Sequence, residues 1–131
     1  MIRAIVFMLL CCCAACATAS KATESQLAHS AQLLMEARAR GDWGAYYDQT
    51  SRSFQATMTR EAFLALPRQV NIQNPEVIAV SSGESGQGLV DVRYDIVVMG
   101  FVFSGKQERL EWLWEQGQWR YVPEVAKMPP G

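Results

Sequence analysis

Two tryptophan-rich stretches separated by Gln116-Gly117 constrain the fold of this chain more than any other feature. A polar residue followed by glycine, between two alternating runs, is typical of a tight β-hairpin. With these two residues as the loop, Trp114 lies opposite Trp119 and Trp112 lies opposite Tyr121. One face of the hairpin is then apolar, and it carries Leu110, Trp112, Trp114, Trp119 and Tyr121. A shift of one residue would turn these side chains towards solvent, so the register is well specified.

The residues before this hairpin predict helices first and strands afterwards. An amphipathic helix is expected over residues 24–40, because four apolar side chains repeat there at helical spacing: Leu27, Ala31, Leu34 and Met35. Two shorter helices are expected, one capped by Asp42 and one capped by Thr59. Alternating apolar residues then predict strands over residues 77–80 and 90–98, with residues 71–75 as a loop. The sequence therefore predicts an α+β domain, with N-terminal helices packed on the concave face of a curved antiparallel four-strand sheet.

The first 19 residues have the layout of a secretory signal peptide. Arg3 precedes a short apolar run, and small residues follow up to Ser20. The apolar run is short for a membrane-spanning helix, which needs about 20 residues. We expect residues 1–19 to direct export, residues 20–123 to form one domain, and residues 124–131 to form a C-terminal tail.

All four cysteines lie within this N-terminal segment. A disulfide framework and a cysteine-based metal site are therefore excluded for the predicted domain. Cys13-Ala14-Ala15-Cys16 resembles the processing site of bacterial lipoproteins, with Cys16 as the lipidation site, although that family has a Leu-like residue where Cys13 stands. Two alternatives stay open: cleavage after Ala19 with soluble release, and an N-terminal anchor that is never cut. We expect the protein in the bacterial cell envelope, lipid-anchored to the membrane or periplasmic.

The charge of the chain is nearly balanced. It has 12 basic and 13 acidic side chains and a formal net charge of −1, and half of its residues are hydrophobic. This balance gives no electrostatic reason to bind nucleic acid, which we do not expect as a partner. No cofactor and no metal site are predicted, because no motif for either occurs in the sequence.

The order of the predicted elements resembles the nuclear transport factor 2-like superfamily, a cone-shaped α+β fold that also houses ketosteroid isomerase and polyketide cyclases. The resemblance spans residues 27–122. It rests on the first helix leading to Gly41-Asp42-Trp43, on the helix before the long strands, and on the closing hairpin at residues 114–121. Within that superfamily the chain is most similar to small bacterial secreted or lipoprotein domains of unknown role. Such a likeness implies a fold rather than a function.

Aromatic side chains are the main candidates for a binding pocket. As an alternative to filling the cone as core, six of them would line an apolar pocket, with phenol and indole groups as its polar points: Tyr47, Tyr94, Trp112, Trp114, Trp119 and Tyr121. His29 falls on the polar face of its helix, where we expect it to be solvated. Asp91 and Asp95 point away from the apolar strand face, and Asp48 is left as the best candidate for a catalytic base.

These features favour a noncatalytic, envelope-associated binding or accessory module that is not an enzyme. Its expected partners are a small apolar or amphipathic ligand and a membrane, reached through the N-terminal lipid. One alternative is a small isomerase-like or cyclase-like enzyme that uses a carboxylate in the cone, as the resemblance implies. The other is an interaction domain that forms a homodimer through the sheet. A carboxylate inside the cone would favour the enzyme, and a contiguous exposed apolar patch would favour the interaction domain.

Overall fold

The computed structural model describes residues 19–68 and 70–124, with side chains described from Glu24 onward. Residues 1–18 of the predicted signal peptide, including the predicted lipidation site Cys16, and the predicted tail after Glu124 lie outside the described residues. The described part forms four helices followed by four strands: α1 (Ala19–Arg40), α2 (Trp43–Asp48), α3 (Arg52–Thr57), α4 (Arg60–Leu64), β1 (Asn71–Ser82), β2 (Gln87–Val98), β3 (Phe101–Glu115) and β4 (Gln118–Val122).

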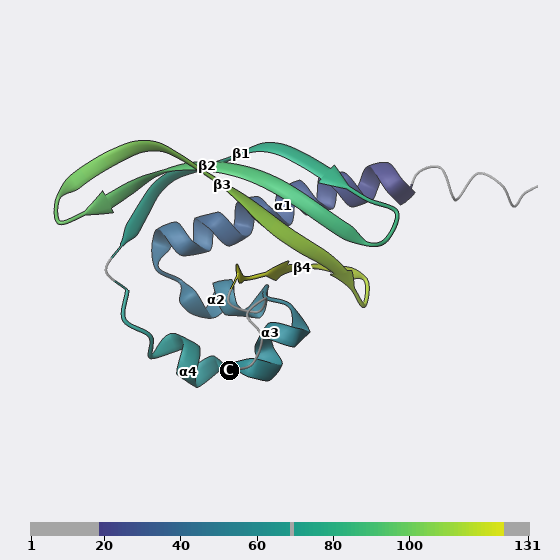
Figure 1. Cartoon of the computed structure of the whole chain (residues 1–131), viewed down its shortest axis with the longest axis horizontal. Coiled ribbons are helices and arrows are strands. Elements are labelled where there is room, and N and C mark those ends of the chain that lie inside the picture. Colours follow the sequence, from purple (N-terminus) through teal and green to yellow (C-terminus); the bar gives the residue numbers. More distant parts are fainter. Residues whose placement is uncertain (1–18, 69, 125–131) are drawn as a thin grey trace, which may run out of the picture.

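The strands form one antiparallel sheet in the order β1-β2-β3-β4, so each strand pairs with its neighbour in the sequence. The sheet curves over α1, and α2, α3 and α4 lie on the same side of it, with α2 and α3 next to β4 (Figure 1). The predicted α+β architecture, with helices packed on the concave face of the sheet, is confirmed. The described residues form four helices, where the sequence analysis expected three.

Helix α1 supplies the centre of the main core. Leu27, Ala31 and Leu34 are fully buried in one cluster with side chains from all four strands, as their spacing predicted. The helix begins at Ala19, several residues before the expected start. It ends where Gly41 adopts a left-handed φ of 73° and the backbone N–H of Asp42 donates to the carbonyl of Ala37 at 2.8 Å. This is a glycine-based helix termination.

The short helices are held by side-chain caps and by a second, smaller core. Asp42 and Thr59 cap α2 and α4 as predicted, since their side-chain oxygens accept from backbone N–H groups one turn later. Ser51 caps α3 in the same way. Helix α3 was not predicted, because its six residues are too few to show a clear helical periodicity. The second core joins the three helices through Tyr47, Phe54 and Phe63.

The predicted loop over residues 71–75 is wrong, because these residues form the beginning of β1. The pairing of β1 with β2 shifts between Gln73 and Glu76, which places Pro75 at an irregularity of the ladder. Strand β1 is at the edge of the sheet. An edge strand with an irregular ladder tolerates a residue that lacks a backbone N–H, so proline does not break the strand here.

The predicted register of the last hairpin is confirmed. Trp112 pairs with Tyr121, and Trp114 pairs with Trp119. Trp112, Trp119 and Tyr121 are buried on the inner face, whereas Trp114 lies near the hairpin end and stays 39% exposed. Strand β4 is also fixed from its other side, because Tyr121 exchanges backbone hydrogen bonds with Gln49 and Ser51 in the α2–α3 linker. Among the described residues, no helix has the length and apolar character needed to span a membrane.

Candidate ligand-binding pocket

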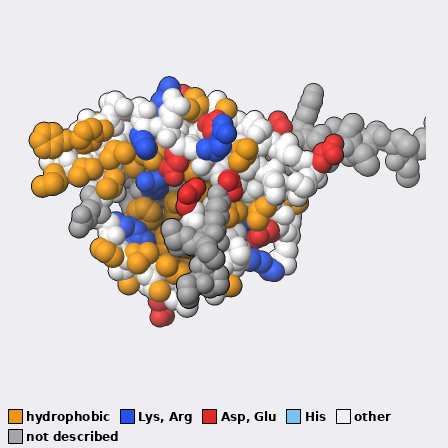
Figure 2. Space-filling model, viewed as in Figure 1, with side chains coloured by type: hydrophobic (Ala, Val, Ile, Leu, Met, Phe, Trp, Pro, Cys, Tyr) orange, Lys and Arg blue, Asp and Glu red, His pale blue; other side chains and the backbone are white. Residues whose placement is uncertain are grey.

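A cavity of about 370 Å³ opens between the short helices and the inner face of the sheet. Its walls are aromatic: Trp43 and Tyr46 come from α2, Phe63 from α4 and Tyr121 from β4. Arg38, Arg68 and Glu108 add charged groups to the lining, and Leu66 belongs to the lining as well. Figure 2 shows a hollow on this face with hydrophobic side chains inside it and basic side chains around it.

One group of polar side chains lies at the inner side of this cavity. Glu108 of β3 accepts a hydrogen bond from the Tyr94 hydroxyl at 2.7 Å and pairs with Arg38 of α1 at 3.4 Å, in both cases through Oε2. The Arg38 guanidinium lies 5.0 Å from the centre of the Tyr94 ring. The side chains of Arg38 and Glu108 are 24% and 32% exposed, so the pair is reached from the cavity without being free in solvent.

The surroundings of this group keep its tyrosines protonated and its arginine charged. Burial, together with the hydrogen bond to Glu108, raises the pKa of Tyr94 to about 12. Burial also raises the pKa of Tyr46 and of Tyr121. Burial alone would lower the pKa of Arg38, but the neighbouring Tyr94, Tyr46 and Glu108 outweigh it and raise that pKa. At neutral pH the phenol groups are therefore hydrogen-bond donors.

Arg68 forms part of another wall. Its guanidinium lies 4.2 Å from the ring centre of Trp43 and 4.7 Å from that of Phe63. It donates to the backbone carbonyls of Phe63 at 2.7 Å and of Leu66 at 2.9 Å, close to the end of α4. Burial lowers the pKa of Arg68. Within the described part of the chain, no carboxylate forms an ion pair with it.

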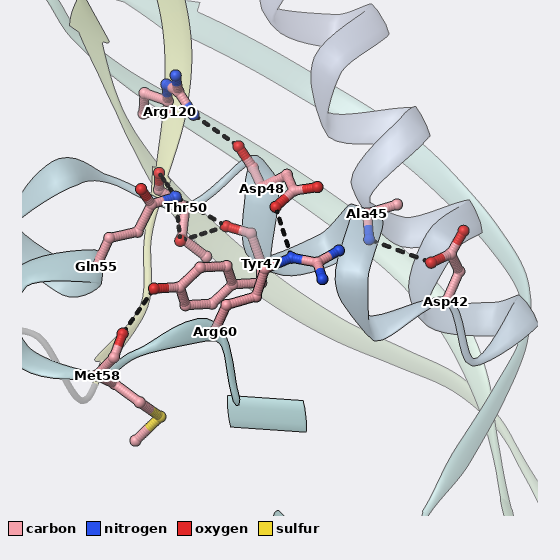
Figure 3. A network of polar contacts seen from close by, with 9 residues as sticks. All are labelled: Asp42, Ala45, Tyr47, Asp48, Thr50, Gln55, Met58, Arg60 and Arg120. Atoms are coloured by element: carbon pink, nitrogen blue, oxygen red, sulfur yellow. Dashed lines mark hydrogen bonds and ion pairs between the residues drawn. The ribbon is translucent and has the colours of Figure 1, made fainter. Parts of the chain in front are cut away.

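The three aspartates considered from the sequence lie away from this cavity. Asp48 has a side chain 60% exposed and pairs with Arg60 at 3.2 Å, as Figure 3 shows. Asp91 pairs with Arg109 on the outer sheet face, and this hydrogen bond lowers the pKa of the Asp91 carboxyl. Asp95 accepts from the Asn74 side chain and the Gly105 backbone N–H. None of these carboxylates faces a tyrosine hydroxyl in the cavity.

The expectation that one face of the hairpin is apolar does not extend along β3 to Glu108. This residue stands two positions before Leu110 and therefore lies on the same inner face. The sequence analysis began the inner face of this strand at Leu110 and missed the carboxylate. Extending the alternation of inner and outer residues from Leu110 back to position 108 would have predicted that Glu108 lies on the inner face. Arg38, Trp43 and Arg68 were missed as well, because only the folded structure brings them to one cavity.

The six aromatic candidates are divided among several places. Tyr121 lines the cavity, and Tyr94 reaches it through Glu108. Tyr47 is buried in the second core, where its hydroxyl donates to the Met58 carbonyl at 2.7 Å (Figure 3). Trp112 is buried in the main core. Trp114 and Trp119 contact each other edge to face and line a separate groove of about 350 Å³, together with the exposed His29.

No metal centre is evident in the part of the chain that the structure describes. No three side chains among its histidines and carboxylates are grouped in a way that could hold a metal ion. The chemistry available at the cavity is therefore that of aromatic contact, hydrogen bonding from tyrosine, and charge from arginine and glutamate.

The raised tyrosine pKa values predict a loss of stability at alkaline pH. Tyr94 ionises near pH 10 in the unfolded chain but near 12 in the folded protein. As pH rises, the Tyr94 hydroxyl therefore loses its proton in the unfolded chain before it does so in the folded protein. The folded state loses free energy of unfolding as pH rises from about 10 to about 12, and below pH 10 this contribution is fully present. Thermal melts across this range should show a falling Tm, and the fall should be smaller in Tyr94→Phe. An equal fall in both proteins would contradict the assignment to Tyr94.

Comparisons with known proteins identify a related fold but no family. No family model matches the chain, and no curated protein matches it. A SEC-C motif containing protein from Rhodopseudomonas palustris, known from its solution structure, is similar in fold, with a TM-score of 0.55 and 18% identity. The similarity covers 69% of this chain and 73% of that protein. The resemblance to the nuclear transport factor 2-like superfamily is therefore corrected: the chain is similar in fold to a SEC-C motif containing protein.

Proposed function

We propose that this domain is a noncatalytic binding module that takes a small apolar or amphipathic molecule in the aromatic cavity. The observation that carries the proposal is an aromatic-walled cavity of about 370 Å³ with a few polar groups on its lining. Sites for small molecules are mostly apolar hollows in which a small number of polar groups fix the orientation of the ligand. The sequence of residues 1–19 supports placing this module in the cell envelope.

The aromatic side chains and the charged side chains of the cavity have different roles in binding. Trp43, Tyr46 and Phe63 provide apolar ring surface, and contact with these rings gives most of the binding free energy. Glu108 and Arg38 provide a fixed acceptor and donor at the inner side. Tyr94 and Arg38 both donate to the same Glu108 oxygen, Oε2. The other carboxylate oxygen, Oε1, can therefore accept a hydrogen bond from a ligand hydroxyl or amine.

The test uses an environment-sensitive amphipathic dye, anilinonaphthalene sulfonate, and a substitution that enlarges one side chain of the cavity lining. Leu66 lines the cavity and is 44% exposed, whereas Leu64 is 42% exposed and does not line it. Leu66→Trp should therefore weaken dye binding by about tenfold or more, which corresponds to about 1.4 kcal/mol. Leu64→Trp adds the same indole close by in the sequence and should leave the affinity within about twofold.

Equal dye binding by the wild type, Leu66→Trp and Leu64→Trp would contradict the proposal, because the dye would then bind elsewhere. Thermal melts of both variants check that neither substitution disturbs the fold. Both leucines are exposed, so losses of more than about 1 kcal/mol are not expected.

One observation favours a second candidate function. Glu108 is a carboxylate within 2.7 Å of a tyrosine hydroxyl beside an open cavity, an arrangement that serves proton transfer at a bound substrate. In that case Glu108 would take a proton and the tyrosines would donate to the developing oxyanion. Glu108→Gln distinguishes the two functions: a binding module keeps its ligand with a modest change in affinity, whereas an enzyme keeps its ligand and loses turnover.

A further inference from the structure

The turn between β2 and β3 carries an apolar surface of its own. Every residue from 96 to 103 is either a large hydrophobic residue or glycine. We call this segment the hairpin tip. Figure 1 shows that it projects at one end of the molecule, beyond the helices that cover the rest of the sheet, and Figure 2 shows the same end covered with hydrophobic side chains.

The end of the hairpin tip is among the most exposed hydrophobic surface in the described chain. Met99 is 92% exposed, Phe101 70%, Phe103 61% and Val102 56%. Single exposed apolar residues are ordinary, but a contiguous group of large ones marks an interaction site. The end of the hairpin tip is also separate from the ligand cavity, because none of these four residues lines it.

Met99, in the turn between β2 and β3, has a backbone conformation that disfavours an apolar side chain. Met99 and Gly100 both adopt positive φ, at 50° and 82°. Two-residue hairpin loops of this kind favour asparagine, aspartate or glycine at the first position, because other side chains are strained there. A methionine at this position brings strain and exposes its side chain to solvent, so folding does not explain its presence.

Both faces of the hairpin tip are apolar. The pairing Val98–Phe101 and Ile96–Phe103 places these four side chains on one face. The pairing Val97–Val102 lies on the opposite face. A flat protein surface would cover one face and leave the other in water. A fluid apolar medium covers both faces and the turn at once.

We infer that the hairpin tip inserts into a phospholipid surface. The tip is too small for a stable contact with a second copy of the chain, since specific protein interfaces involve about 20–30 residues on each side. Insertion into lipid has no such minimum, because each buried apolar group adds to the binding.

The polar residues at the base of the tip define the depth of insertion. Asp95 ends the apolar segment on β2, where it is held by Asn74 and by the Gly105 backbone N–H. On β3 the segment is followed by Ser104 and Gly105, and Lys106 is the first charged residue there and is exposed. A lysine at this level matches the anionic headgroups of a bilayer. The apolar tip would lie below the headgroups, within the roughly 5–10 Å that interfacial protein segments reach.

The test is photocrosslinking of the full chain on unilamellar vesicles of phosphatidylcholine and phosphatidylglycerol. Benzoylphenylalanine replaces Phe103 in one protein and Leu89 in a matched control, since Leu89 is also exposed and apolar but belongs to β2 outside the tip. Recording adducts by position separates the tip from any contact made by residues 1–18. We expect lipid adducts at position 103 at least about fivefold above those at position 89.

A further substitution inside the tip makes the result specific. Met99→Ser together with Val102→Ser should reduce the lipid adduct at position 103 severalfold, without lowering the melting temperature, because both side chains are exposed. Equal lipid adducts at positions 103 and 89 would overturn the inference. A protein–protein adduct at position 103, in place of a lipid adduct, would overturn it as well and would point to self-association.

Discussion

Replacing Trp112 by alanine is expected to lower the free energy of unfolding by about 3–5 kcal/mol, the range for truncating a large buried aromatic residue. Trp112 is 1% exposed and contacts the Tyr121 ring in the middle of the main core. Denaturant melts measure the loss. Arg120→Ala, on the opposite face of the same hairpin, should cost less than about 1 kcal/mol. Similar losses at both positions would contradict the inner placement of Trp112.

Trp112→Phe refines this experiment. The indole N–H of Trp112 is buried and has no hydrogen-bond partner, which is an unfavourable polar contribution. Phenylalanine removes that group and keeps much of the apolar surface. We therefore expect Trp112→Phe to be clearly less destabilising than Trp112→Ala. Equal losses for the two variants would show that packing shape alone determines stability at this position.

The second large effect is expected at Gly88, where β2 crosses the core. A Cβ atom here would lie 2.6 Å from Leu27 and 3.0 Å from the Trp119 ring. Both neighbours are buried and have little room to move, so Gly88→Ala should cost about 1–3 kcal/mol through overpacking. Gly83→Ala is the matched control. The nearest atom to its Cβ would be 3.9 Å away, so melts of this variant should match the wild type.

The parts of the fold that were predicted from the sequence depend on local patterns. The closing hairpin has a two-residue turn and strict alternation, and its register was confirmed residue by residue. The buried face of α1 follows from the spacing of Leu27, Ala31 and Leu34. The predicted first strand was shorter than β1, because Asn74 and Pro75 are typical turn residues. Proline is tolerated there because β1 is at the sheet edge, and that position is determined by tertiary structure rather than by the local sequence.

The candidate site was harder to predict, because its residues come from distant parts of the chain. Arg38 and Glu108 are 70 positions apart and meet only because α1 packs under the sheet. Tyr94 and Tyr121 were singled out from the sequence, yet for aromatic character alone. The alternation that made Leu110 and Trp112 inner residues also made Glu108 one. A charged residue on an apolar face was the one local sign of the site.

Strand β4 determines when the short helices α2, α3 and α4 can pack in their final positions. It lies between β3 on one side and the linker between α2 and α3 on the other, where Tyr121 bonds Gln49 and Ser51. During synthesis β4 emerges after every other described element, so the small helices lack this attachment until then. Contacts of such long sequence separation slow folding. The layer of short helices is therefore expected to form late, after β4 has paired with β3.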